Sequence, residues 1–500
     1  MIFRVLDDHP VDDLADHIAR GGGEALRAAR LVDPAVIVDL LAESGLRGRG
    51  GAGFPTATKW RTILTNASPI HRTSVVINAA EGEPSTFKDR TILRNNVFRV
   101  FEGALIACHV VDAVELVIAV KDSFDTELRI IDAAVTEMRE AGWLDSIDVR
   151  VVRGPGSYLF GEETAMLEVI SNRPPFPRVS PPWRRGVDDV VDGDGATAEL
   201  AGANGTTGAP ALVNNVETFA NVALIVAHGA PWFREVGTVE SPGTIVCTVV
   251  GDTRRHGVGE FAMGTPLRDV IEALGGGTDA GRRIIAVLPG ASAAIIGENA
   301  LATPLTHEDM RAAGSALGSA GFYCIDDAAD TFALAHGASR FLSVESCGQC
   351  VPCKDDGLAV TSLLAQLLDG TAETDVSVRI GARLATITNG ARCSLASQQQ
   401  VVISSLLALC VATPVPTEPN AHDDVANRTA ERVLGSALRP LLDIVDGVAI
   451  LDDSFAAKQP DWSYDATSSG LYPVQRLHGA TTLARHDQPA STAELMAGTS

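Results

Sequence analysis

The sequence predicts a multidomain protein: an α/β domain, then a smaller α+β module, then a helical region. In the first half, β-branched runs alternate with helical segments, which is typical of a parallel α/β sheet. From about residue 240, short strands surround one helix, and beyond Cys353 the apolar spacing becomes helical. The 500 residues allow several domains, because single hydrophobic cores stop growing near about 250–300 residues.

Composition and charge exclude several classes of function. The net charge of −23 argues against a nucleic-acid partner. Of the eight cysteines, four are scattered in apolar contexts, which fits a reducing compartment better than a disulfide framework. The start MIFRVLDDHPVDD is acidic where a signal peptide is basic, and no apolar run reaches about 18 residues. We therefore expect a cytoplasmic protein that meets the inner face of a membrane only through other subunits.

The α/β domain is predicted over residues 22–235, after an N-terminal lead-in at 1–21. Asp33-Pro34 opens a helix, with proline at a first-turn position where its missing N–H costs nothing. The predicted strands lie at 73–79, 115–120 and 148–154, with a helix at 97–111 between the first two. The acidic, glycine-rich segment 184–210 is predicted to be a surface excursion.

Three further regions follow the α/β domain. Residues 240–335 form the α+β module, and residues 336–414 form the helical region, with helices at 357–370, 376–390 and 398–410. The extension 415–500 contains one predicted helix, at 430–445, and a polar tail. We expect this extension to contact a partner or to be partly disordered.

Four cysteines form the pattern with the clearest chemistry. Cys347, Cys350 and Cys353 lie in the run SCGQCVPC, and Cys393 follows after a gap. A C-x2-C-x2-C turn with one remote cysteine supplies the four thiolates that a [4Fe–4S] cluster needs. Structural zinc more often uses two separated C-x2-C pairs, and a redox pair does not need the third cysteine. An iron–sulfur cluster is the leading interpretation, with zinc and free thiols as alternatives.

A glycine-rich run is a candidate anion site. Gly48-Arg49-Gly50-Gly51-Ala52-Gly53 satisfies G-x-G-x-x-G, but the preceding residues read as helix, so the context of a dinucleotide fingerprint is missing. Residues without Cβ let backbone N–H groups approach a phosphate or a flat ring, and Arg49 and Lys59 add positive charge. The alternative is a flexible turn.

Two polar segments are ambiguous by themselves. Glu162 and Glu163 follow a glycine turn and precede a helix, so they could face a ligand or complement the helix dipole. Asn214 and Asn215 could hold a ligand or cap a helix.

Taken together, six motifs resemble one family. The segments GLRGRGGAGFPTATKW, INAAEGEPSTFKDR, GSYLFGEETA, NRPPFPR, VNNVET and SCGQCVPCK occur in the order found in the NADH-binding flavoprotein subunit of respiratory complex I and its relatives in NAD-linked hydrogenases and formate dehydrogenases. The resemblance covers residues 22–412. It implies an α/β domain that binds FMN, a ubiquitin-like (β-grasp) module of the soluble-ligand-binding type, and a small helical bundle carrying one [4Fe–4S] cluster.

The resemblance also implies site residues. The implied FMN contacts are Gly48, Arg49, Gly50, Lys59, Asn78, Glu81, Tyr158, Gly161, Glu162, Glu163, Asn214, Asn215 and Thr218. The implied dinucleotide contacts are Phe54, Glu83 and Glu163, and we expect Glu81 and Glu163 to be the catalytic carboxylates.

The chain departs from the family pattern at positions that matter for binding. Ala80 replaces an aspartate at the flavin site, Thr62 replaces an aromatic ring expected against adenine, and Ser180 replaces a lysine, while Trp183 keeps an aromatic residue. Losing one stacking face and one cation weakens dinucleotide binding.

The predicted function is an enzyme subunit that relays electrons between NAD(H), FMN and a [4Fe–4S] cluster. The expected partners are a thioredoxin-like [2Fe–2S] subunit and a larger iron–sulfur or molybdenum- or nickel-containing catalytic subunit. The alternative is an electron-conduit or scaffold subunit that keeps the cluster but has lost NADH binding.

Overall fold

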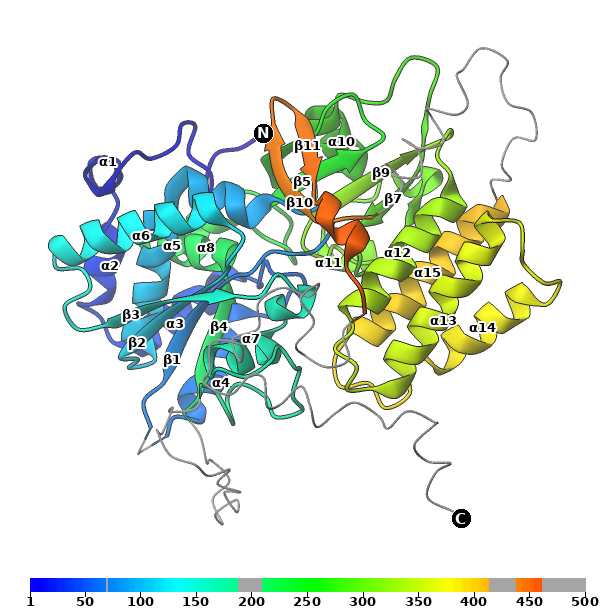
Figure 1. The fold of residues 1–500 in the computed structure, drawn as a ribbon. Coiled ribbons are helices and arrows are strands. Elements are labelled where there is room, and N and C mark those ends of the chain that lie inside the picture. The colour runs from blue at the N-terminus through cyan, green and yellow to red at the C-terminus, as the bar shows by residue number, and fades with distance from the viewer. Residues whose placement is uncertain (69–70, 188–208, 413–437, 461–500) are drawn as a thin grey trace, which may run out of the picture.

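A computed structural model describes residues 1–68, 71–187, 209–412 and 438–460. Figure 1 shows the α/β domain on one side, a group of helices from residues 331–412 on the other, and a small mixed sheet above the junction between them. The predicted surface excursion lies mostly outside the described residues, as do residues 430–437 of the predicted C-terminal helix.

The first domain is built on a parallel sheet of four strands in the order β3-β2-β1-β4. The three predicted strands are confirmed, whereas the fourth was not predicted, because Asn214 and Asn215 suggest a helix cap alone. The strands are β1 (Ser74–Ala79), β2 (Glu115–Lys121), β3 (Asp148–Gly154) and β4 (Ala211–Asn215).

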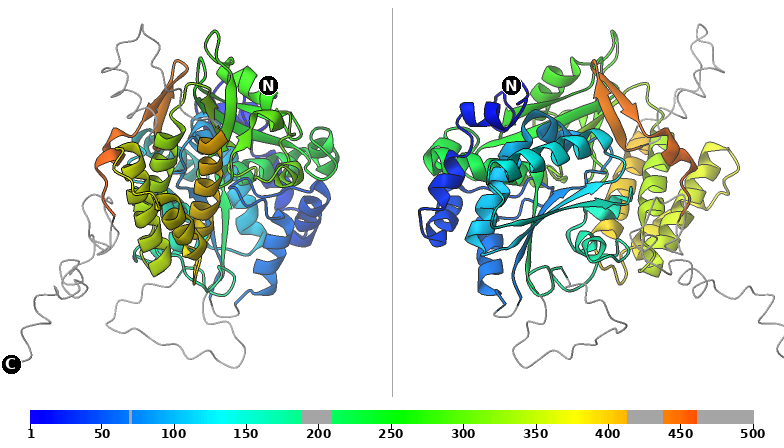
Figure 2. Two further views of the ribbon diagram at one scale, coloured as in Figure 1. Left: turned by 90° about the vertical axis from the view of Figure 1, so that its right-hand side faces the viewer. Right: turned by 60° about the vertical axis from the view of Figure 1, so that its left-hand side comes forward.

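Helices cover both faces of this sheet (Figure 2). Side chains alternate along each strand: Val75 and Ile77 join the core beneath α5, α6 and α8, whereas Val76 packs with α7 on the other face. Gly103 allows α5 to touch α8, since a Cβ there would lie 1.9 Å from the carbonyl oxygen of Phe219. The helices are α1 (Leu14–Ala19), α2 (Glu24–Ala29), α3 (Pro34–Ser44), α4 (Thr56–Thr65), α5 (Lys88–Val110), α6 (Asp125–Glu140), η1 (Tyr158–Gly161), α7 (Glu163–Ile170), α8 (Val216–His228) and α9 (Ala230–Arg234).

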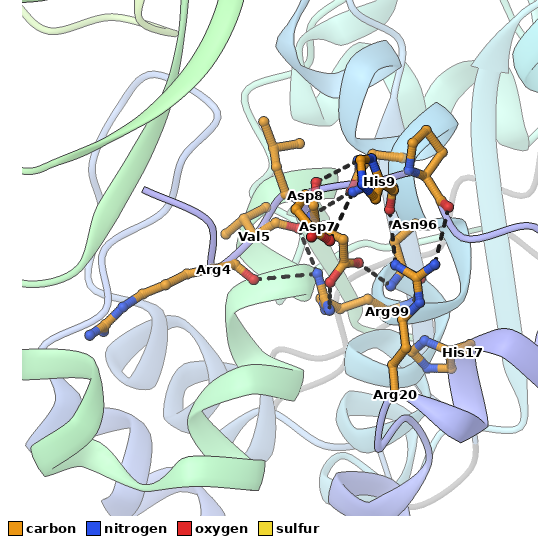
Figure 3. A network of polar contacts seen from close by, with 12 residues as sticks. Arg4, Val5, Asp7, Asp8, His9, His17, Arg20, Asn96 and Arg99 are labelled. Carbon is orange, nitrogen blue, oxygen red and sulfur yellow. Dashed lines mark hydrogen bonds and ion pairs between the residues drawn. The ribbon is translucent and has the colours of Figure 1, made fainter. Parts of the chain in front are cut away.

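The N-terminal segment is an integral part of the domain. Val5 and Leu6 are buried in its core. Figure 3 shows Arg99 paired with Asp7 at 2.8 Å and donating to the Val5 carbonyl at 2.8 Å. The Asn96 amide donates to Asp7 at 2.8 Å, at the kink where α5 leaves helical geometry. The lead-in therefore packs against α5 and does not merely precede the domain.

The second unit is a mixed five-stranded sheet in the order β6-β5-β9-β7-β8, in which only β5 and β9 pair in parallel. Helix α10 buries Leu267, Val270, Ile271 and Leu274 against it, at the i, i+3, i+4, i+7 spacing of an amphipathic helix. Its elements are β5 (Thr244–Gly251), β6 (Gly257–Ala262), α10 (Leu267–Gly275), β7 (Ile284–Pro289), β8 (Ile296–Gly297), η2 (Glu298–Ala300), α11 (His307–Ala312) and β9 (Gly321–Asp326).

The third unit contains four helices that share one apolar core. They are α12 (Thr331–Glu345), α13 (Val351–Leu368), α14 (Val376–Thr386) and α15 (Leu395–Ala412). Among the described helices, α15 alone is long and apolar enough to cross a membrane. It buries Val402, Ile403 and Leu406 against the other helices, as a core helix of a water-soluble domain does.

The described part of the C-terminal extension is a hairpin, β10 (Leu441–Val445) and β11 (Val448–Leu451), followed by η3 (Asp453–Ala457). The prediction of helix was wrong at residues 441–445. Pro440 lacks the N–H that a helix interior needs, and the β-branched Ile444 and Val445 favour a strand.

Candidate functional site

The parallel sheet has a topological switch point between β1 and β4. Successive strands β1, β2 and β3 run outward on one side of β1, and β4 lies on its other side. In open α/β sheets, ligands bind outside the carboxyl ends of the strands at such a point. Asn78 and Asn215 are register partners here, so the structure brings two predicted site residues from distant segments together.

The loop after β1 lies at this switch point. The region outside the carboxyl ends of β1 and β4 is called the crevice below. The Asn78 side chain donates to the Gly161 carbonyl at 2.8 Å and accepts from the Ala80 N–H at 3.2 Å, which ties the loop to the glycine turn before α7. Ser85 adopts a left-handed φ of 70°. Within the described chain, the buried hydroxyls of Ser85 and Ser157 have no hydrogen-bond partner. Unpaired buried hydroxyls at the carboxyl ends of β1 and β3 fit a polar ligand in the crevice.

A buried charge cluster underlies the crevice. The Lys88 ammonium lies 2.6 Å from Asp89 and 3.0 Å from Glu217, and it donates to the Asn215 side chain at 3.2 Å. Burial alone disfavours a charged lysine, but the two carboxylates outweigh it and raise the pKa of Lys88. Lys88, Asp89 and Glu217 are absent from the predicted site. The signal that could have found them is a Lys-Asp-Arg triplet opening a helix inside the motif INAAEGEPSTFKDR.

The two glutamates of the β1 loop are held by protein groups. Glu81 accepts from the Asp89 N–H at 3.1 Å and pairs with Arg90 at 3.0 Å. Glu83 accepts from the Ala291 N–H at 3.0 Å, and its burial raises the pKa of the carboxyl. Both Glu81 oxygens thus have partners within the chain. The structure gives Glu81 a role in holding the loop, and its catalytic role remains a prediction.

The two cations predicted at the glycine-rich loop have different surroundings. The Arg49 guanidinium is buried and donates to the carbonyls of Thr244 at 3.1 Å and Pro242 at 3.2 Å, so it holds the mixed sheet. It also lies 3.9 Å from Glu217 of the buried charge cluster, and the Arg49 N–H donates to Thr218 at 2.9 Å. The Lys59 ammonium lies 2.6 Å from Glu163. The contribution of both charges to ligand binding stays a prediction.

The remaining predicted residues lie around the same crevice. Gly50 approaches Asn215 so closely that a Cβ on Gly50 would lie 3.2 Å from the Asn215 Cβ. Asn214 accepts from the Trp60 indole at 3.0 Å when its amide is oriented to satisfy both ends. Gly48 donates its N–H to the carbonyl of Phe54, whose side chain is 52% exposed.

The capping interpretation of Asn215 is confirmed, whereas of the two glutamates expected in the first turn of α7, Glu163 lies there and Glu162 is the N-cap. Asn215 is the N-cap of α8 and accepts from the Glu217 N–H at 3.0 Å. Glu162 is the N-cap of α7 and accepts from the Ala165 N–H at 2.8 Å, while burial raises the pKa of this carboxyl. Capping uses one side-chain oxygen of each residue and places both at helix N-termini, where anions are stabilised.

The departures from the family pattern have structural correlates. Ala80 is buried in the apolar cluster on the α7 face of the sheet. The Thr62 hydroxyl donates to the Thr58 carbonyl of its own helix at 2.9 Å. Neither side chain replaces the carboxylate or the ring that the family pattern has there.

The four cysteines gather where three helix ends meet. Cys347 and Cys350 lie between α12 and α13, Cys353 lies in the first turn of α13, and Cys393 lies just before α15. All four pack against the same apolar core. Across the described ranges, no three Cys, His, Asp or Glu side chains converge tightly enough for one metal ion.

Polar groups surround the sulfur atoms. The Gln399 amide donates to the Cys353 sulfur at 3.2 Å, and the Gln349 amide donates to the Cys347 sulfur at 3.5 Å. Burial raises the pKa of Cys393 to about 12, and the neighbouring Cys347 contributes in the same direction. The buried Lys354 ammonium acts in the opposite direction on Cys353. Burial thus disfavours the thiolate forms of Cys347, Cys353 and Cys393, and a metal that binds these thiolates would displace their protons.

Comparison with known proteins agrees with this geometry. Residues 41–224 match the model of the Nuo51 FMN-binding domain, residues 246–293 match the SLBB domain, and residues 333–411 match the NADH-ubiquinone oxidoreductase-F iron–sulfur binding region. An NADH-quinone oxidoreductase chain of Rhizobium meliloti is 37% identical over 371 residues, which are 72% of this chain and 84% of the relative. The chain belongs to the Nuo51 flavoprotein family of NADH-quinone oxidoreductases.

Other members of the family occur in hydrogenases. The NADP-reducing hydrogenase subunit HndC of Solidesulfovibrio fructosivorans is 31% identical over 375 residues, which are 72% of this chain and 71% of that protein. The crystal structure of an NAD⁺-reducing [NiFe]-hydrogenase in the H2-reduced state superposes with a TM-score of 0.68 and 30% identity, covering 85% of this chain and 72% of that chain.

Family membership confirms the cofactor predictions. The chain contains an FMN-binding domain and a [4Fe–4S]-binding region, and it is a flavo-iron–sulfur oxidoreductase subunit. The switch-point crevice falls inside the matched FMN-binding domain, and all four cysteines fall inside the matched iron–sulfur region.

Proposed function

We propose that this Nuo51-type chain takes a hydride from NADH onto FMN in the switch-point crevice and passes the electrons singly to the [4Fe–4S] cluster and then to partner subunits. The observation that carries the proposal is the junction between the two sites. Glu345 ends α12 two residues before Cys347, and its carboxylate accepts from the backbone N–H of Tyr158 at 2.9 Å. One hydrogen bond thus joins the cysteine loop to the glycine turn of the crevice.

The residues present fit FMN and the cluster. FMN supplies conversion of a two-electron hydride into single electrons. Lys59, the glycine-rich loop and the N-terminus of α8 offer positive potential for its phosphate. The hydroxyls of Ser85 and Ser157 offer polar contacts inside the crevice. Cys347, Cys350, Cys353 and Cys393 would hold the cluster.

Binding of the dinucleotide is assigned to the open side of the crevice. Phe54 offers an exposed ring for stacking, and Glu83 and Glu163 offer carboxylates that can accept hydrogen bonds from ribose hydroxyls. The chain's own task is to align the nicotinamide, to bind phosphates and to exclude water. No side chain needs to transfer a proton for a hydride to move.

The finer domain description follows the same proposal. We assign residues 240–335 to a β-grasp module, because its mixed sheet wraps one amphipathic helix and has a central parallel pair. We assign residues 336–414 to a helical bundle whose helix ends present the cysteines. A thioredoxin-like [2Fe–2S] subunit and a larger iron–sulfur, molybdenum or nickel subunit are the proposed partners, with membrane contact only through them.

A second function has a specific observation in its favour. Ala80 is buried among apolar side chains, and Thr62 bonds to its own helix, so two family contacts to flavin and adenine have no substitute. A subunit that keeps the cluster without accepting electrons from NADH would tolerate both changes. It would serve as an electron conduit in a formate dehydrogenase or hydrogenase-type complex.

An anaerobic spectrum distinguishes the two functions. The complex is purified, its flavin absorbance near 450 nm is recorded, and NADH is added without oxygen. Bleaching of the flavin supports the NADH-oxidising subunit. Flavin that ignores NADH, or a cluster without flavin, overturns it in favour of the electron conduit. Cys393→Ser serves as the matched control, because bleaching by NADH should persist when the cluster is lost.

A further inference from the structure

Residues 438–460 lie outside the segments that match the family models, yet they touch all three units of the chain. In Figures 1 and 2 this segment runs as an orange to red hairpin and turn over the junction between the α/β domain, the mixed sheet and the four helices. Leu438 and Phe455 are buried in the core of the helical unit, and Leu441 is buried against Phe87 and Val250. This segment is called the strap below.

One end of the strap is bound to the α/β domain and the mixed sheet. Arg90 donates to the carbonyls of Leu441 at 2.8 Å and Leu442 at 3.1 Å, and Arg94 pairs with Asp443 at 2.9 Å. His256 donates its backbone N–H to the Gly447 carbonyl at 2.7 Å. Arg90 also holds Glu81, so the residue that fixes the β1 loop also fixes the strap.

The other end of the strap is bound to α12. Arg340 donates to the carbonyls of Phe455 at 3.1 Å, Ala456 at 2.8 Å and Lys458 at 2.7 Å. The ring of Phe455 packs on Phe341, with 5.2 Å between centroids. Three hydrogen bonds to carbonyls of one turn fix its backbone, which aims the Lys458 side chain inward.

Lys458 supplies the counter-charge of the junction. Its ammonium lies 2.6 Å from one oxygen of Glu345, and the other oxygen of Glu345 accepts from the Tyr158 N–H at 2.9 Å. Glu345 and Lys458 are both buried. A buried carboxylate is strongly disfavoured without a paired cation, and Lys121 is a second buried cation that acts electrostatically on Glu345. Removing Lys458 breaks the ion pair at 2.6 Å and frees the Glu345 side chain to turn away, which weakens its hydrogen bond with the Tyr158 N–H.

We propose that Lys458 is a positioning residue that holds the flavin side of the molecule against the cluster side through Glu345 and Tyr158. The predicted effect on electron transfer rests on the proposed function. The structural part, that Lys458 holds the Tyr158 turn in place through Glu345, does not depend on it. The extension thereby completes the path between the two cofactors. A tilt of the Tyr158 turn would change the distance between them.

Hydrogen exchange tests the structural part. Amide exchange is followed by mass spectrometry on the full chain in its complex, for Lys458→Met, Lys458→Arg and Gln459→Ala, the last being an exposed neighbour on the same turn. We expect Lys458→Met to speed exchange at the Tyr158 turn by about tenfold or more. Lys458→Arg should restore protection, and Gln459→Ala should leave it unchanged.

The results separate this inference from the proposed function. Unchanged exchange at the Tyr158 turn in Lys458→Met overturns the inference, as does loss of protection throughout the sheet, since the effect would then be global. If exchange is faster only at the Tyr158 turn and NADH does not bleach the flavin, the positioning role of Lys458 is supported and the proposal that this subunit oxidises NADH is overturned. Where NADH does reduce the flavin, rapid mixing should show cluster reduction slowed about tenfold in Lys458→Met and restored in Lys458→Arg.

Discussion

The crevice and the cysteine pocket, formed by Cys347, Cys350, Cys353 and Cys393, differ in how their buried polar groups are paired. In the crevice, the charges are paired with one another: Lys88 with Asp89 and Glu217, and Glu81 with Arg90. In the pocket, the four thiols are not bonded to each other as disulfides. The charged groups of the crevice neutralise one another, whereas the thiols of the pocket would ionise when a metal cluster binds to them.

This difference determines how each site should fail. Removing one partner from the crevice leaves an unpaired buried charge, so the loss should be seen in the stability of the protein. Removing one thiol from the pocket removes one of the four cluster ligands, so the loss should be seen in metal content. Three tests examine this contrast.

The largest effect is expected at Cys393, the thiol that comes from a separate segment. Cys393→Ser should reduce cluster iron to less than about a tenth of the wild-type value, because a cubane needs all four thiolates. Iron analysis and low-temperature EPR measure the loss. The matched control is Cys108→Ala, which removes a buried thiol from the core around α5. A variant that loses Cys393 and keeps the full iron content would contradict the four-thiol pocket.

The second effect is expected in the crevice. Lys88→Met should lower the free energy of unfolding by about 3–5 kcal/mol, because Asp89 and Glu217 remain buried without their cation. Urea unfolding of the cofactor-free chain measures the change. Adding Glu217→Gln to Lys88→Met should recover part of the loss, since it removes one of the unpaired charges.

An exposed ion pair provides the control for this test. Arg72 lies 3.7 Å from Asp112, and both side chains are mostly exposed. Arg72→Ala should change the free energy of unfolding by no more than about 0.5 kcal/mol. A Lys88→Met variant as stable as Arg72→Ala would mean that the buried cluster does not hold the crevice together.

The same contrast explains what the sequence could predict. The cysteine spacing is local, because three of the four ligands come from one loop, so the pocket can be found without knowing the fold. The crevice depends on β1 and β4, whose register pairs Asn78 with Asn215 across more than a hundred residues. Composition and periodicity do not predict that pairing. Only the resemblance to a family assigned Asn78 and Asn215 to the same site.

Long-range contacts also account for what the sequence could not predict. The destination of the Arg49 side chain depends on the carbonyls of Thr244 and Pro242, which belong to the next unit. The strand at 441–445 forms where Arg90 and Arg94 hold its backbone and Asp443. Helical spacing in residues 430–445 could not reveal those partners, because tertiary contacts override local preference.

The smallest effect concerns His307, which packs under the glycine-rich loop on the crevice side. A Cβ on Gly53 would lie 2.3 Å from the His307 ring, so the loop backbone covers the imidazole. Burial, aided by the positive charges of Arg47 and Arg49, lowers the pKa of His307 to about 3. An unfolded chain regains the ordinary value of about 6.5, so it binds a proton below that pH when the native state does not.

The contribution of His307 to the free energy of unfolding should therefore fall as the pH drops from 6.5 toward 3. The contribution of His307 between pH 7 and pH 5 is about 2 kcal/mol. His307→Gln should remove that part of the acid dependence, whereas His9→Gln, at an exposed position, should leave it unchanged. Urea unfolding at pH 7 and pH 5 measures both slopes. Equal slopes in the wild type and His307→Gln would show that the loop does not keep this imidazole neutral, and that the crevice is less closely packed than the buried pairs around Lys88 imply.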